Sequence, residues 1–179
     1  TIFQIYRDAN PKAEIGVLSE WAGIQFLVDT LSTDYHAVAP DYNKFPTALC
    51  EMAEKYIKEN KPSLVAICFD NPDHVGHKEG HDTPAYYSKL EELDGYIARI
   101  VAAVKEAGMY DDTIFIITSD HGGIKKGHGG KTMAEMQTPF IIAGKNIKKA
   151  GEFQESMVQY DVAATMAYIF GLEQPQVWT

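Results

Sequence analysis

The sequence predicts an α/β fold with a mainly parallel sheet and helices on both of its faces. Three observations indicate this class. Short apolar runs alternate with longer segments whose apolar residues recur at helical spacing, which is the pattern of right-handed βαβ units. The run at 63–69 is apolar throughout, as expected of a central strand buried on both faces. The chain has 179 residues, 45% of them hydrophobic, which is enough for one domain with a core.

The N-terminal third is expected to alternate helices and strands. Asn10-Pro11 closes the first helical pattern, and Pro40 stops the second strand pattern. In order along the chain, we expect a helix at 2–9, a strand at 14–19, a helix at 22–31, a strand at 35–39 and a helix at 45–60.

The longest helix is expected at residues 84–107. Thr83 is a suitable N-cap, Pro84 fits the first helical position, and Gly108 supplies the C-terminal stop. Further along, the patterns predict strands at 113–118 and 139–143 and a helix at 156–170. Because we find no internal repeat or linker, we expect residues 1–179 to form a single α/β domain.

Composition excludes several classes of function. The formal net charge of -9 argues against a surface for nucleic-acid polymers, which needs clustered Lys and Arg, but it is compatible with a small phosphate ester held by metal ions. No run approaches the ~20 apolar residues of a membrane-spanning helix. The two cysteines, Cys50 and Cys68, lie in a helix pattern and a strand pattern, and we interpret them as core thiols.

Carboxylate and imidazole side chains follow two of the predicted strands. Asp73 and His77 come after the strand at 63–69, and Asp120 and His121 come directly after the strand at 113–118. His128 follows between two glycines, which permit close approach of the backbone. Loops at the carboxyl ends of strands in one sheet can converge, and these side chains suit zinc, manganese or iron. The sequence therefore predicts a metal site.

Other polar residues in these loops have simpler interpretations. Asp70 is expected to cap a turn over Pro72, and His74 and His81 to be exposed loop residues. His36, in a strand pattern, is interpreted as structural. Two catalytic motifs are excluded. Gly129-Gly130-Lys131-Thr132 lacks the earlier glycine of a phosphate-binding P-loop, and no Gly-x-Ser-x-Gly elbow occurs.

The order of the motifs resembles that of a known superfamily. Asp73-x-x-x-His77 is followed by Thr118-Ser119-Asp120-His121-Gly122 and then by Gly127-His128-Gly129. This combination resembles the alkaline phosphatase superfamily, most closely its type I phosphodiesterase/nucleotide pyrophosphatase and sulfatase-like branch. Smaller stretches agree with that branch, namely His81-Asp82-Thr83-Pro84, Thr138-Pro139-Phe140-Ile141 and Gln159-Tyr160-Asp161.

The resemblance implies a site with two divalent metal ions, usually zinc, within an alkaline phosphatase-like sandwich. By resemblance, Asp73, His77 and His128 hold the first ion, and Asp120 and His121 hold the second. The family also needs a further Asp and a Thr or Ser nucleophile, which this chain does not match. We therefore expect the chain to be the C-terminal portion of a longer hydrolase and to have little or no activity alone.

The resemblance leaves alternatives open. A phosphodiesterase or phosphatase is the leading expectation, and a sulfatase or a phosphoglycerate-mutase-like relative would share its metal ligands. The sulfatase motif Cys-x-Pro-x-Arg is absent, since Glu51-Met52-Ala53 follows Cys50. A non-catalytic metal-binding module and a metal-free α/β domain are further alternatives. The resemblance also favours a periplasmic or secreted location.

Overall fold

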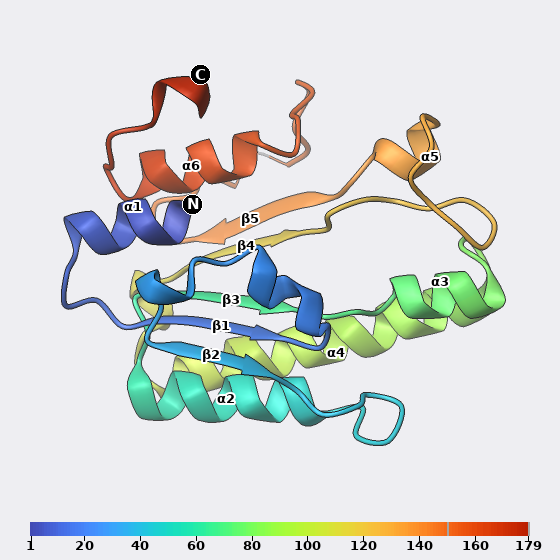
Figure 1. Ribbon diagram of the computed structural model, residues 1–179, viewed down its shortest axis with the longest axis horizontal. Coiled ribbons are helices and arrows are strands. Elements are labelled where there is room, and N and C mark those ends of the chain that lie inside the picture. Colours follow the sequence, from blue (N-terminus) through green and yellow to red (C-terminus); the bar gives the residue numbers. More distant parts are fainter. Residues whose placement is uncertain (150, 179) are drawn as a thin grey trace.

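The predicted α/β fold is confirmed, with a layer of strands between two layers of helices (Figure 1). The structure is a computed structural model that describes residues 1–149 and 151–178. Three strands form a parallel sheet in the order β2-β1-β3, and their bounds are Ile15–Ser19 for β1, Tyr35–Val38 for β2 and Leu64–Cys68 for β3. Each lies within one or two residues of its predicted position.

Two further strands depart from the parallel arrangement. β4 (Ile114–Thr118) and β5 (Phe140–Gly144) pair antiparallel, with Thr118 opposite Phe140. The segment between them, described in full, contains one short helix, α5 (Met133–Met136). It lacks the long crossover helix that a parallel pairing of β4 with β5 would require. Among the described residues, no ladder joins β3 to β4, although they lie side by side in Figure 1.

The prediction that the strand at 63–69 is the central, fully buried one was wrong. β1 lies between β2 and β3, and all five of its residues are buried, whereas four of the five residues of β3 are half-buried. The sequence of β1 conceals this burial because it contains a glycine and a serine. Gly16 is needed there, since a Cβ atom would lie 2.3 Å from the Tyr56 ring that packs against it.

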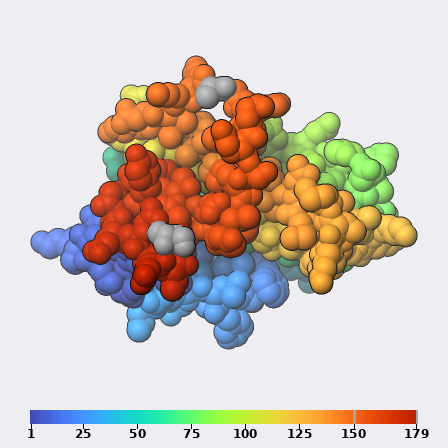
Figure 2. Space-filling view, turned by 90° about the horizontal axis from the view of Figure 1, so that it is seen from above, coloured from blue at the N-terminus to red at the C-terminus, as the bar shows by residue number. Residues whose placement is uncertain are grey.

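Helices cover both faces of the sheet (Figure 1). On one face lie α2 (Ala48–Asn60) and α4 (Pro84–Glu106), and on the other lie α1 (Ile2–Ala9) and α6 (Asp161–Ile169). Leu18 packs against Leu49 of α2, whereas Ile15 packs against Tyr6 of α1. Alternate residues of β1 therefore enter different layers of the core. Figure 2 shows the N-terminal and C-terminal segments (blue and red) side by side.

The ends of α4 follow the predicted local chemistry. The Thr83 side chain accepts a hydrogen bond from the Tyr86 N–H at 3.3 Å, and Gly108 has a left-handed φ of 73°. Thr83 therefore marks the start of the helix, and Gly108 marks its end. Beyond it, the 3-10 helix η3 (Tyr110–Asp112) leads into β4.

The predicted helix at 22–31 was wrong. The chain forms two short 3-10 helices, η1 (Ala22–Phe26) and η2 (Thr30–Ser32). Asp29 lies between them in an extended conformation, and its side chain accepts a hydrogen bond from the Leu31 N–H. Phe26 and Leu31 are 84% and 93% exposed, so their helical spacing does not correspond to a buried face. The helix expected at 156–170 begins only at Asp161.

The two cysteines behave as core thiols. Both are free, Cys50 is buried in α2, and Cys68 is half-buried at the end of β3. Burial raises the pKa of each thiol to about 11, which disfavours the reactive thiolate at neutral pH. At the C-terminus, a 3-10 helix, η4, covers Gln176–Trp178. No helix among the described residues is long and apolar enough to cross a membrane.

A bidentate ion pair joins the helices α2 and α4. Because of this pair, we expect the stability of the fold to depend on pH. Arg99 donates from Nε to Glu54 Oε1 at 2.8 Å and from Nη2 to Oε2 at 2.9 Å. This contact lowers the pKa of Glu54 below 4.5, so its stabilising effect is complete above pH 4.5 and is lost as the pH falls through the lowered pKa. In urea unfolding, Glu54→Gln should cost about 1 kcal/mol or less at pH 7.

That difference should shrink as the pH falls below 4.5. Arg99→Gln, which removes the partner of Glu54, should show the same pH dependence. A cost for Glu54→Gln that stays constant from pH 7 to pH 3 would contradict this account.

Candidate metal centre

The first two predicted ligands lie on one short helix at the carboxyl end of β3. The helix α3 (Asp73–Glu79) begins at Asp73, and His77 follows one turn later on the same face. Asp73 Oδ2 lies 3.2 Å from His77 Nε2. The carbonyl oxygen of Lys126 lies 2.9 Å from His77 Nδ1, so that nitrogen is the donor of this pair and Nε2 is the ring nitrogen that faces Asp73.

The third predicted ligand comes from the long segment after β4. His128 Nε2 lies 3.1 Å from His77 Nε2 and 3.7 Å from Asp73 Oδ1. One ligand atom from each of the three residues lies within 4.8 Å of the other two. Gly129, next to His128, has a φ of 95°, which a residue with a side chain rarely adopts. Figures 1 and 2 both place this segment beside α3.

The donor set fits a divalent cation. Asp73 Oδ1 is buried and has no hydrogen-bond partner among the described residues, which is costly for a carboxylate oxygen unless a cation compensates it. Two imidazole nitrogens and a carboxylate oxygen converge on the same point, and they are the ligands found in zinc sites with three protein ligands. The cluster of Asp73, His77 and His128 could therefore hold a metal ion.

The other two predicted ligands are arranged differently. The His121 ring stacks on the His128 ring, with centroids 3.7 Å apart and an angle of 18° between the planes. The Asp120 side chain is 88% exposed, and its Oδ2 lies 3.6 Å from His121 Nε2. His121 is thus in contact with the three-residue cluster, whereas the Asp120 carboxylate extends into solvent beside it.

One residue that the sequence interpretation missed holds the segments around the cluster together. Glu135 of α5 is buried, and its carboxylate accepts hydrogen bonds from Gly130 N at 2.9 Å and Thr132 Oγ1 at 2.6 Å. Its carbonyl oxygen accepts another from Gly122 N at 2.8 Å. The Thr132 hydroxyl lowers the pKa of Glu135. The Thr132-x-x-Glu135 spacing of a capping box was the available signal.

The interpretation of His81 as an exposed loop residue was wrong. Its side chain is only 4% exposed, and its Nε2 lies 3.4 Å from Asp73 Oδ1. The slot that it fills exists because Gly76 and Gly123 have no side chains. His74 is half-buried rather than exposed and packs edge-on against Tyr42, with ring centroids 5.1 Å apart. Sequence spacing does not reveal such tertiary contacts.

Asp70 differs from the expectation, whereas His36 lies in a strand as expected. The Asp70 side chain pairs with the Tyr42 hydroxyl and the Asp70 N–H donates to Glu20 Oε2 at 2.8 Å, instead of the carboxylate capping a turn over Pro72. His36 Nε2 in β2 is buried without a hydrogen-bond partner among the described residues.

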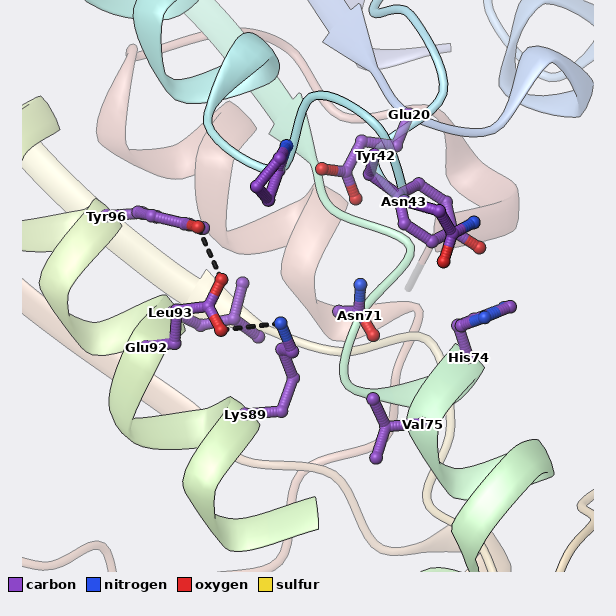
Figure 3. Close-up of a pocket in the computed structure, with 11 residues that line it drawn as sticks. Glu20, Tyr42, Asn43, Asn71, His74, Val75, Lys89, Glu92, Leu93 and Tyr96 are labelled. Atoms are coloured by element: carbon purple, nitrogen blue, oxygen red, sulfur yellow. Dashed lines mark hydrogen bonds and ion pairs between the residues drawn. The ribbon is translucent and has the colours of Figure 1, made fainter. Parts of the chain in front are cut away.

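A cavity of about 250 Å³ lies beside α3 and is lined by none of the three cluster residues (Figure 3). His74 and Val75 of α3 face it, and Glu92 at its wall binds Lys89 Nζ at 2.6 Å and the Tyr96 hydroxyl. Burial raises the pKa of Glu20, which also lines the cavity. Of the charged groups in this wall, Glu92 and Lys89 therefore compensate each other.

The match of most of the chain to a family model places it in the alkaline phosphatase superfamily. Within it, the chain belongs to the type I phosphodiesterase / nucleotide pyrophosphatase family, whose sequence model matches residues 12–155. That membership supports a phosphate-ester-processing function.

Curated relatives share part of their length with this chain. The catalytic subunit of human GPI ethanolamine phosphate transferase 2 is 28% identical over 142 residues, which cover 76% of this chain and 14% of the relative. The 2,3-bisphosphoglycerate-independent phosphoglycerate mutase of Vibrio parahaemolyticus is 34% identical over 134 residues, which cover 70% of this chain and 24% of the relative. The chain thus spans less than a third of the length of either relative.

Solved structures share the fold. Ps i-CgsB, solved with k-i-k-neocarrahexaose, superposes with a TM-score of 0.71 at 16% identity, covering 99% of this chain and 54% of that one. Murine ectonucleotide pyrophosphatase / phosphodiesterase 5, solved with AMP, superposes with a TM-score of 0.50 at 21% identity, covering 67% and 31%. At these identities, the likeness supports the fold alone.

Proposed function

We propose that the protein is part of a metal-dependent phosphoric ester hydrolase and that Asp73, His77 and His128 hold one of its two divalent ions, zinc or manganese. The observation that carries the proposal is the convergence of three ligand atoms within 4.8 Å, one of them on the residue whose Oδ1 is buried and unpartnered. Membership of a phosphodiesterase family gives this cluster its chemical context.

The residues of the chain have separate tasks in this proposal. Asp73 supplies negative charge, and His77, oriented by the Lys126 carbonyl oxygen, presents Nε2 to the ion. His128 closes the first site from a different segment, while Asp120 and His121 contribute to the second. When bound, the ions would stabilise charge on the phosphoryl group and lower the pKa of a bound water toward ~7. We assign the nucleophile and the remaining Asp ligand to polypeptide outside these 179 residues.

The substrate proposed is a small phosphate ester rather than a nucleic-acid polymer, because the chain carries a net charge of -9. A phosphotransferase or a mutase is the second candidate, favoured by the 34% identity to a phosphoglycerate mutase. Two further alternatives are a sulfatase-like enzyme, which would hydrolyse a sulfate ester, and a non-catalytic module, which would bind metal without hydrolysing an ester. We also propose that the chain is a single domain and that it forms the C-terminal portion of the enzyme. We propose a periplasmic or secreted location for this enzyme.

The test compares the complete polypeptide of the reading frame with the 179-residue chain. We expect the complete polypeptide to hydrolyse bis-p-nitrophenyl phosphate, to lose activity in a chelator, and to recover it with Zn²⁺ or Mn²⁺. The chain alone should show little or no turnover. Equal turnover by both proteins would refute the proposal that the nucleophile lies outside the 179 residues. Activity that survives complete metal removal would refute the proposal that the enzyme depends on metal. Turnover that appears only with an added alcohol acceptor would indicate a transferase.

A further inference from the structure

The short helix α5 contacts both of the loops that carry the proposed ligands His121 and His128. It meets each loop at a glycine. The carbonyl oxygen of Glu135 accepts a hydrogen bond at 2.8 Å from the N–H of Gly122, which directly follows His121. The Glu135 carboxylate accepts one at 2.9 Å from the N–H of Gly130, two residues after His128. One residue therefore joins the two loops, through its main chain to the first and through its side chain to the second.

The helix approaches both loops too closely for a side chain at either glycine. A Cβ atom on Gly122 would lie 2.2 Å from the Ala134 carbonyl oxygen. A Cβ atom on Gly130 would lie 2.6 Å from Glu135 Oε2. Beyond these contacts, the imidazole rings of the two loops stack on each other, with centroids 3.7 Å apart. The helix α5 thus fixes the backbone of both loops close to the stacked rings.

The contact with the second loop requires a carboxylate. Glu135 Oε1 accepts from the Gly130 N–H, and Oε2 accepts from the Thr132 N–H at 3.4 Å and from the Thr132 hydroxyl at 2.6 Å. Both N–H groups can only donate, and an ionised carboxylate offers an accepting oxygen to each of them. A glutamine would offer one oxygen and would turn its NH₂ group toward one of the two donors. Because Glu135 is buried, water would compensate such a loss poorly.

We propose that Glu135 is a positioning residue that holds the His128 loop in the conformation needed for metal binding. This inference rests on the proposed metal site. Asp73 and His77 lie on α3, so the site is complete only when the His128 loop is held against that helix. Glycines flank His128 on both sides and give this loop unusual backbone freedom. A contact that fixes Gly130 lowers the entropic cost of ordering His128 around an ion.

Glu135→Gln tests the proposal with little change in side-chain size. We expect it to weaken Zn²⁺ binding by the 179-residue chain about tenfold, because groups that orient metal ligands contribute 10–100-fold to metal affinity and Glu135 acts through the backbone. The measurement is competition with a chromophoric chelator, and the Tm of each metal-free variant reports its folding. Zn²⁺ binding by Glu135→Gln that equals that of the wild type would overturn the positioning role.

The same change in a second background separates positioning from a general loss of stability. In His128→Ala, the imidazole that Glu135 is proposed to position is absent. Adding Glu135→Gln to His128→Ala should therefore leave the remaining Zn²⁺ affinity unchanged, although it should lower the Tm as it does in the wild type. A tenfold loss of affinity in both backgrounds would overturn the proposal, because the effect would then not depend on His128.

Glu54→Gln is the matched control, since Glu54 also accepts two hydrogen bonds through its carboxylate, but from Arg99 and on a different helix. It should lower stability and yet bind Zn²⁺ like the wild type. An equal loss of affinity in Glu54→Gln and Glu135→Gln would overturn the positioning role.

His74→Gln is the second control, because His74 lies next to Asp73 on the same helix but packs against Tyr42. It should also bind Zn²⁺ like the wild type. A wild-type chain that binds no Zn²⁺ would instead overturn the proposed metal site itself.

Discussion

Replacing His128 with alanine is expected to weaken Zn²⁺ binding by at least about a hundredfold while leaving the fold intact. Partners of ligands alone contribute 10–100-fold, and His128 is proposed to be a ligand itself. Without it, only Asp73 and His77 remain of the cluster, and both lie on one turn of α3. The His128 side chain is 30% exposed in a loop, so its removal opens no cavity in the core.

The measurement combines chelator competition with thermal unfolding. Because an ion that binds only the folded state raises its stability, excess Zn²⁺ should raise the Tm of the wild type and should leave that of His128→Ala unchanged. Without metal, the two proteins should unfold at similar temperatures. His74→Gln again serves as the control and should retain the Zn²⁺-dependent increase. The same increase in His128→Ala would show that the assigned ligand set is wrong.

Elements whose ends depend on local chemistry could be predicted from the sequence. The helix α4 begins and ends as predicted because the Thr83 cap and the Gly108 stop act on their own neighbours. The segment at 22–31 could not be predicted, because its apolar residues have helical spacing but face solvent. The central strand was misassigned for the opposite reason. Gly16 weakens the apolar pattern of β1, and only the packed Tyr56 ring explains the glycine.

Some features of the candidate site could likewise be predicted from the sequence, and others could not. The sequence indicated that Asp73 and His77 follow the same strand, but we expected them in a loop, whereas the structure has them on one face of the helix α3. That His128 joins them, and that the Asp120 carboxylate is exposed, depends on how the segment after β4 folds back on α3. His81 could not be recognised, because its burial requires Gly76 and Gly123, which lie on different segments. Contacts between segments that are distant in the sequence leave no periodic pattern in that sequence.

The exposed carboxylate of Asp120 leads to the second large expected effect. Asp120→Asn should leave Zn²⁺ binding at the Asp73 cluster unchanged, because Asp120 is not one of the three converging ligands. In the complete polypeptide, the same change should reduce phosphodiester hydrolysis by at least about a hundredfold. A metal ion contributes several kcal/mol of charge stabilisation in the transition state, and 1.36 kcal/mol corresponds to a factor of ten in rate.

Metal analysis after dialysis separates the two proposed ions. The 179-residue chain should retain one Zn²⁺ per molecule, with or without the Asp120→Asn change, and the complete wild-type polypeptide should retain two. Asp112→Asn is the control, since Asp112 is an exposed partner of Lys145 remote from the site in the fold, between α4 and β4. It should keep full turnover. A complete polypeptide that loses turnover in Asp120→Asn yet still retains two ions would argue that Asp120 acts on the substrate rather than on a metal, because the second ion would then be held without its carboxylate.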